Sequence, residues 1–291
     1  MSNISFKNIS KKYGNMELLK DISFECNNEI LYLAGANGVG KTTLIKIALG
    51  IEYADAGKVS YDNKKIAEQY CNISSVLDEP SYYPNISGEK NLSIFTKKAA
   101  NRMSILQDLH LDDSLLRKPL KSYSLGQIHR FAIAIALINN PKYIFLDEPT
   151  IGLDPISWNI IKNCITKLAE RDCSIIITGH DYDEIEQISD KFIILKDKRI
   201  VYTATKSDVI KQNNKDVYFI TIDRLSLEIK EKFRLYETID KSYFLYITTL
   251  PDARIEELFI ALSSNNVKYS NLEIKNSGIK NLLKRYLEKE Q

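Results

Sequence analysis

One run of eight residues constrains this chain more than any other feature of its sequence. It fits the pattern G-x-x-x-x-G-K-[ST] at every fixed position and reads Gly35-Ala36-Asn37-Gly38-Val39-Gly40-Lys41-Thr42. An apolar segment of strand length, residues 29–34, precedes the run, and residues 42–49 follow it with helical periodicity. This is the context in which the motif binds phosphate, so the sequence predicts a strand, a phosphate-binding loop and a helix in succession.

The fixed positions of this loop suit a nucleoside triphosphate. Glycines let the main chain curl so that successive N–H groups point at phosphate oxygens, and the following helix adds the positive end of its dipole. Lys41 would reach the β- and γ-phosphates, and the Thr42 hydroxyl would ligate Mg²⁺. The expected nucleotide-binding residues are Gly35, Asn37, Gly38, Val39, Gly40, Lys41, Thr42 and Thr43.

A second motif is an apolar segment, residues 143–146, that leads into Asp147 and Glu148. A buried strand does not normally end in adjacent carboxylates unless cations or water meet them there. We expect Asp147 to join the Mg²⁺ site through a bridging water. We expect Glu148 to polarise the attacking water, as general base or as a group that positions it. Alone, the pair also suits a solvated strand end, but beside the phosphate loop it indicates triphosphate hydrolysis.

The remaining patterns predict an α/β core. Segments 143–146 and 174–178 have strand character and flank a helical stretch at 157–170, which is the β-α-β alternation of a parallel sheet. Earlier in the chain, short apolar runs at 4–9 and 18–24 predict antiparallel strands.

Helical patterns dominate residues 78–136, which include an amphipathic run at 105–116 and a long apolar helix from Gln127 onward. We expect this part to form a helical subdomain within an ATPase domain that covers residues 1–205.

Past residue 205 the patterns change. Strands are expected at 217–222 and 243–248, and a helix is expected at 255–263. A final amphipathic helix would carry on one face Ile279, Leu282, Leu283, Tyr286 and Leu287. We expect residues 206–291 to form a small C-terminal subdomain of helices and strands.

Composition excludes several classes of protein. The net charge is +2, from 40 basic and 38 acidic side chains, so no nucleic-acid partner is expected. The most apolar stretch, residues 131–138, is far shorter than the roughly 20 residues that cross a bilayer as a helix. The N-terminus lacks the pattern of a signal peptide, and the four cysteines form no CxxC motif. We therefore expect a cytoplasmic chain with reduced thiols, which acts at a membrane only through another chain.

Further along, Ser124-Leu125-Gly126-Gln127 follows Tyr123 and precedes the long apolar helix. This run resembles the signature, usually written LSGGQ, of the ABC ATPases. In that family the signature lies at a helix N-terminus and contacts the γ-phosphate bound to the opposite subunit. The resemblance implies that two cassettes sandwich two ATP molecules, with Ser124, Gly126 and Gln127 contacting the nucleotide.

Three more motifs fit the same family in order along residues 2–205. The run from Asp147 to Pro155 is similar to its acidic strand and D-loop, in which Asp154 would communicate across the dimer. His180 matches the switch histidine that contacts the γ-phosphate. Tyr13 stands where the family carries an aromatic residue that stacks on adenine.

Two positions depart from the family pattern. Asp78 occupies the place of the Q-loop glutamine, where an acid would still approach Mg²⁺, and Leu125 replaces a glycine of the signature. With these features the chain resembles the exporters that handle peptide antibiotics, lantibiotics or bacitracin, including self-immunity transporters. The resemblance implies ATP-driven export of, or immunity to, a peptide antibiotic or a drug.

The resemblance implies a P-loop ABC cassette with a RecA-like parallel-sheet core, an antiparallel β subdomain and an α-helical subdomain, followed by a small α+β extension. The implied cofactors are ATP and Mg²⁺. The implied partners are a transmembrane permease subunit, received near residues 78–87 with Tyr82 and Tyr83, and a second cassette as a homodimer or heterodimer. The chain would then lie at the cytoplasmic face of the membrane.

Two other functions remain open from the sequence. One is an ABC-type ATPase that acts on nucleic acid or ribosomes, although such proteins usually carry tandem cassettes or long coiled coils. The other is a nucleotide-binding regulatory module without turnover, which Asp78 and Leu125 suggest.

Overall fold

A computed structural model describes residues 2–77, 82–96, 101–179, 182–212, 217–222, 226–233, 236–240, 243–248, 252–265, 267 and 269–275. Contacts between Cα atoms divide the chain into two compact units, and the second unit begins at Ser207.

A six-stranded sheet forms the centre of the first unit, in the order β5-β6-β7-β3-β8-β9. Its strands are β3 (Ile30–Gly35), β5 (Ile73–Val76), β6 (Tyr143–Leu146), β7 (Ser174–Thr178), β8 (Lys191–Lys196) and β9 (Arg199–Thr205). The first five pair in parallel, and β9 pairs with β8 antiparallel. Every residue of β3, β6 and β7 is buried, as expected for strands covered on both faces. The strands predicted at 29–34, 143–146 and 174–178 are thereby confirmed, and so is the α/β class.

A three-stranded antiparallel sheet adjoins this core, in the order β2-β1-β4. It consists of β1 (Asn3–Tyr13), β2 (Met16–Asn27) and β4 (Ala56–Tyr61). Gly14, with φ 58°, allows the tight turn between β1 and β2. The sequence patterns predicted β1 and β2 but not β4. The Phe6 and Phe24 rings stack at 4.3 Å within a hydrophobic cluster that also contains Leu33 and Phe145, so the two sheets share one core.

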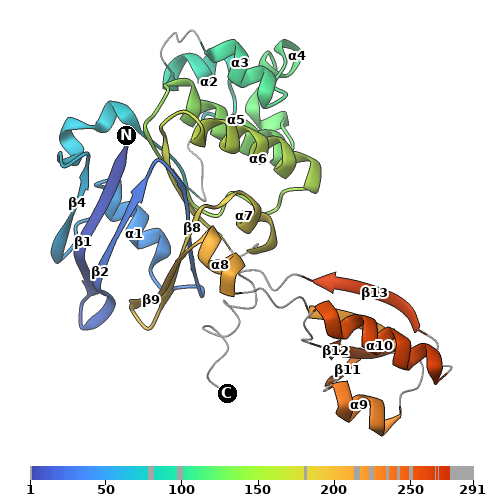
Figure 1. The fold of residues 1–291 in the computed structure, drawn as a ribbon. Coiled ribbons are helices and arrows are strands. Elements are labelled where there is room, and N and C mark those ends of the chain that lie inside the picture. The colour runs from blue at the N-terminus through green and yellow to red at the C-terminus, as the bar shows by residue number, and fades with distance from the viewer. Residues whose placement is uncertain are drawn as a thin grey trace. The chain divides into compact units, whose positions relative to one another are not determined.

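The helices of the first unit are α1 (Lys41–Ala48), α2 (Gly88–Phe95), α3 (Arg102–Asp108), α4 (Asp113–Leu116), α5 (Leu125–Ile138), α6 (Pro155–Ala169) and α7 (Tyr182–Ile188). Single 3-10 turns occur at η1 (Ile66–Glu68), η2 (Tyr70–Asn72) and η3 (Leu120–Ser122). Helices α2 to α6 pack on one another (Figure 1). Among the described residues, no helix is both long and apolar enough to cross a bilayer.

The amphipathic run predicted at 105–116 is helical but is divided between two helices, because α3 ends at Asp108 and α4 begins at Asp113. His110 adopts a left-handed conformation, with φ 51°, which an α-helix does not tolerate. The Asp112 carboxylate then accepts a hydrogen bond from the Leu115 N–H at 2.8 Å and caps α4. The apolar spacing continued across this break, so periodicity alone did not reveal it.

Helix α8 (Lys206–Gln212) spans the boundary between the units in the sequence. The second unit contains β10 (Val217–Ile222), α9 (Leu227–Phe233), β11 (Tyr236–Asp240), β12 (Tyr243–Thr248), α10 (Asp252–Ser264) and β13 (Tyr269–Lys275). The strands pair antiparallel in the order β11-β12-β10-β13, which makes a β-α-β-β-α-β unit of the ferredoxin-like type. Side chains Ile229, Phe233, Leu258 and Leu262 of α9 and α10 form a small core. The expected final helix lies outside the described residues.

Candidate active site

The glycine-rich loop connects β3 to α1 at the carboxyl end of the central sheet, where ligands bind in open α/β folds. Gly38 and Gly40 have φ of 76° and 109°, conformations that strongly favour glycine. A Cβ on Gly35 would lie 2.7 Å from the Leu195 carbonyl oxygen, and one on Gly40 would lie 2.7 Å from Leu19 Cδ2. The loop is therefore curled over its own core in a way that larger residues would prevent.

Lys41 lies on the inner side of this loop and its side chain is 6% exposed. Its Nζ donates hydrogen bonds to the carbonyl oxygens of Gly35 at 2.8 Å and Ala36 at 3.3 Å. Burial lowers the pKa of the ammonium, while the neighbouring Glu148 and Asp147 carboxylates oppose that shift. Lys41 Nζ is 3.9 Å from Glu148 Oε1, so the loop and the acidic pair meet in one site.

Asp147 and Glu148 leave the end of β6. Asp147 is 2% exposed, and its main-chain N–H donates to the Val76 carbonyl at 2.8 Å. Glu148 has φ 54°, a left-handed conformation that is uncommon for residues other than glycine and is often found at functional sites. The Thr178 hydroxyl, on the neighbouring strand β7, donates to Asp147 Oδ1 and accepts from the Glu148 N–H at 3.1 Å. Thr178 is not among the predicted site residues, although it is a hydroxyl residue that follows three isoleucines directly before Gly179.

The signature-like run forms the start of α5. The Ser124 hydroxyl accepts from the Gln127 N–H at 3.3 Å, and Gln127 Oε1 accepts from the Ser124 N–H at 2.9 Å, which together make a capping box. A Cβ on Gly126 would lie 2.4 Å from Ser157 Oγ, so a larger residue here would require the Ser157 side chain to move. Leu125, the unusual residue of the run, is 54% exposed.

Asp154 caps the neighbouring helix α6. Its carboxylate accepts from the Ser157 N–H at 2.9 Å and from the Ser157 hydroxyl at 2.7 Å. These bonds, the hydroxyl bond first, hold the pKa of Asp154 below its usual value. Gly126, at the start of α5, therefore lies against Asp154 and Ser157 at the start of α6.

Tyr13 ends β1 and is 45% exposed, which leaves part of its ring accessible. Its hydroxyl donates to Glu52, and this bond raises the pKa of the phenol. The Lys11 ammonium lies 5.1 Å from the centre of the ring. Glu52, which sequence analysis also missed, follows the end of α1, so Tyr13 is joined to the segment that leaves the helix of the phosphate loop.

The structure describes some of the other predicted residues but not all of them. Thr42 and Thr43 lie in the first turn of α1, with Thr42 exposed. The Tyr83 ring is 53% exposed and stacks on Phe95 at 5.8 Å. Asp78 and His180 lie outside the described residues.

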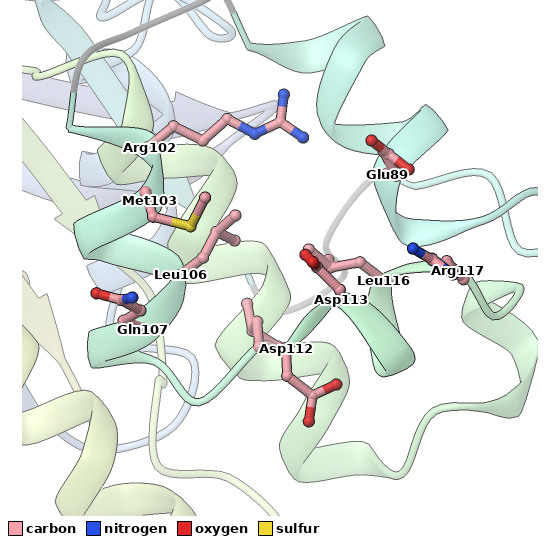
Figure 2. Close-up of a pocket in the computed structure, with 10 residues that line it drawn as sticks. Glu89, Arg102, Met103, Leu106, Gln107, Asp112, Asp113, Leu116 and Arg117 are labelled. Atoms are coloured by element: carbon pink, nitrogen blue, oxygen red, sulfur yellow. The ribbon is translucent and has the colours of Figure 1, made fainter.

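A pocket of about 650 Å³ lies among α2, α3 and α4. Figure 2 shows the side chains that line it. It is lined by two arginines, Arg102 and Arg117, and by the acidic residues Glu89, Asp112 and Asp113. Its lining contains no residue of the glycine-rich loop or of the acidic pair, and its charge is mixed. The phosphate loop, rather than this pocket, has the glycines and the lysine that a triphosphate requires.

Comparison with known proteins agrees with this geometry. Residues 19–151 match the family described as ABC transporter. The chain is 31% identical to an uncharacterized ABC transporter ATP-binding protein, YhcH, of Bacillus subtilis, over 82% of this chain and 81% of that protein. It is 29% identical to the bacitracin transport ATP-binding protein BcrA of Enterococcus faecalis, over 95% of this chain and 89% of BcrA. It is 29% identical to the lantibiotic transport ATP-binding protein SrtF of Streptococcus pyogenes, over 68% of this chain and 89% of SrtF.

Solved structures with a similar fold include a nucleotide-free ATP-binding cassette from an ABC transporter, with 25% identity and a TM-score of 0.64 over 73% of this chain and 94% of that one. Another is an ATP-binding cassette of an ABC transporter in its ADP conformation, with 26% identity and a TM-score of 0.63 over the same shares of the two chains.

Proposed function

This chain belongs to the ATP-binding proteins of ABC transporters, and on that premise we propose that it hydrolyses ATP to drive a separate membrane-spanning subunit that exports a peptide antibiotic or a drug. The observation that carries the hydrolytic role is the meeting of Lys41 and Glu148 at 3.9 Å beside the phosphate loop. The transport names of the bacitracin and lantibiotic relatives support the class of substrate.

Binding would use the main-chain N–H groups of the loop and the N-terminus of α1. An ammonium group has three N–H donors, and two of those on Lys41 are directed at the Gly35 and Ala36 carbonyls. The third would bond a β- or γ-phosphate oxygen. The exposed ring of Tyr13 would stack on the adenine.

Hydrolysis would use Glu148. Its carboxylate, 12% exposed, would orient a water molecule and accept its proton as the water oxygen bonds to the γ-phosphorus. The bond from that phosphorus to the β-phosphate oxygen breaks in the same displacement. Lys41 would stabilise the charge on the transferred group, and His180 is proposed to contact the same phosphate.

The donor set also fits Mg²⁺, which prefers oxygen ligands and usually keeps substrate phosphates among them. The Thr42 hydroxyl would hold the ion directly, the Asp147 carboxylate would hold it through a bridging water, and Asp78 is proposed to approach it. Phosphate oxygens and water molecules would supply the remaining ligands. Bound Mg²⁺ would neutralise charge on the phosphates.

We further propose that two cassettes close over two ATP molecules. Ser124, Gly126 and Gln127 of one copy would contact the nucleotide on the other, because the start of α5 presents N–H groups and the positive end of a helix dipole. Asp154, at the start of α6, would lie at the same interface. A permease segment would dock near Tyr82 and Tyr83.

The Glu148→Gln variant tests this function. We expect it to bind MgATP with nearly unchanged affinity, to lose at least about 100-fold in turnover because the carboxylate acts on the water, and to accumulate as a dimer with ATP. Phosphate release and light scattering measure the two effects. Glu170→Gln, an exposed change at the end of α6, is the matched control and should behave as the wild type. Rapid steady-state hydrolysis by Glu148→Gln would refute the assignment.

A further inference from the structure

Thr178 is the last residue of β7, and it is 0% exposed. The three residues before it in the strand are isoleucines, so a valine would suit the position as well by packing alone. A buried hydroxyl is costly unless it is hydrogen-bonded. Packing of the core alone therefore does not explain the Thr178 hydroxyl.

The Thr178 hydroxyl makes two bonds, and both go to the acidic pair. It donates to Asp147 Oδ1, and it accepts from the Glu148 N–H at 3.1 Å. Both contacts cross from β7 to the end of the neighbouring strand β6, which carries the proposed metal ligand and the proposed general base. One hydroxyl thus ties together the two residues on which hydrolysis would depend.

The donor of the second bond, the Glu148 N–H, belongs to a residue with an unusual backbone conformation. Glu148 adopts φ 54°, and such a conformation persists only when the surrounding structure holds it. The Glu148 N–H bond to Thr178 is one such restraint. The conformation brings Glu148 Oε1 to 3.9 Å from Lys41 Nζ, so the direction of the carboxylate depends on the backbone that Thr178 holds.

From these contacts we propose that Thr178 is a positioning residue for ATP hydrolysis, whose hydroxyl orients the Asp147 carboxylate and holds Glu148 in its left-handed conformation. This inference rests on the proposed function of Glu148. Thr178 would not contact the nucleotide itself, and it would affect hydrolysis only through Asp147 and Glu148. Loss of the Thr178 hydroxyl should lower kcat and raise the Mg²⁺ concentration required for half-maximal ATP hydrolysis. It should have little effect on ATP affinity.

The test is a pair of substitutions that separate the hydroxyl from the methyl group. Thr178→Val keeps the shape and removes the hydroxyl, and we expect kcat to fall roughly 10- to 100-fold because a small misplacement of a catalytic group has effects of that size. The Kd for ATP should change by less than about threefold. Thr178→Ser keeps the hydroxyl and should retain most of the activity, although it loses packing.

Ser174→Ala is the matched control. Ser174 is a second buried hydroxyl, at the other end of the same strand, and it donates to the Ser2 carbonyl at 2.7 Å. Its loss should lower the urea midpoint without lowering kcat. If kcat falls equally in Ser174→Ala and Thr178→Val, the effect is general destabilisation and the inference is wrong.

Glu148→Gln, assayed in parallel, separates the two claims. Wild-type turnover by Thr178→Val, or activity lost in Thr178→Ser but kept in Thr178→Val, would overturn the inference alone while Glu148→Gln remains inactive. If Glu148→Gln also turns over ATP at the wild-type rate, the proposed function itself fails.

Discussion

At the scale of single residues, Lys41 holds the glycine-rich loop, because its Nζ donates to the Gly35 and Ala36 carbonyls. The glycine-rich pattern predicted a curled loop, and the positive φ of Gly38 and Gly40 shows that curl. The same pattern predicted a lysine near phosphate, and Lys41 lies on the inner side of the loop. Thr178 and Glu52 were missed because their roles come from side chains that are distant in the sequence, and a single strand or loop carries no sign of its neighbour.

Lys41→Ala should weaken ATP binding by about 10- to 100-fold, since a charge-assisted hydrogen bond is worth about 1.5–3 kcal/mol. Isothermal titration calorimetry with MgATP measures the change. Lys46→Ala, on the last turn of the same helix α1, is the control and should leave affinity nearly unaltered. An unchanged Kd in the Lys41 variant would count against its contact with phosphate.

At the scale of elements, apolar periodicity located most strands and helices of the central fold but not all of their ends. The break between α3 and α4 depends on the left-handed His110 and the cap at Asp112, which are local backbone events inside a continuous apolar pattern. A side-chain hydrogen bond between α6 and α7 was also not predicted from the sequence. There Trp158, 3% exposed, donates from Nε1 to Glu184 Oε2 at 2.7 Å.

Removing the Glu184 carboxylate, which accepts the Trp158 hydrogen bond, should destabilise the packing of α6 on α7. In Glu184→Ala the buried indole N–H of Trp158 loses its partner, so we expect a loss of about 1–2 kcal/mol in the free energy of unfolding. Glu184→Gln retains an amide oxygen there and should lose less. Urea titration followed by tryptophan fluorescence reports the change directly, because the chain has one Trp. Equal stability of the alanine variant and the wild type would show that the bond contributes nothing.

At the scale of the whole molecule, the alternation of strands and helices predicted an α/β core, but it did not predict how the strands are ordered. The positions of β5 and β8 in the central sheet, and of β13 in the second unit, depend on pairing with strands that are distant in the sequence. Local patterns carry little information on such pairing. The ferredoxin-like topology of the second unit was therefore not visible in its sequence.

Burial in the folded molecule also determines which cysteine thiols can be alkylated. Burial raises the pKa of Cys164 to about 11 and that of Cys173 to about 12, and it raises the pKa of Cys26 as well. Thiolates are the reactive species, so these three side chains should resist iodoacetamide at pH 8, while the exposed Cys71 should be alkylated. Mass spectrometry should find one label per folded chain and four after unfolding in urea. Rapid labelling of Cys164 in the folded protein would contradict the packing described for α6.

The most direct measurement of the central claim is an experimental structure of the Glu148→Gln protein with MgATP. We expect the γ-phosphate to lie in hydrogen-bonding contact with Lys41, and Ser124 and Gly126 of a second copy to contact that same phosphate. A nucleotide bound away from the 35–42 loop, or a start of α5 remote from every bound nucleotide, would contradict it.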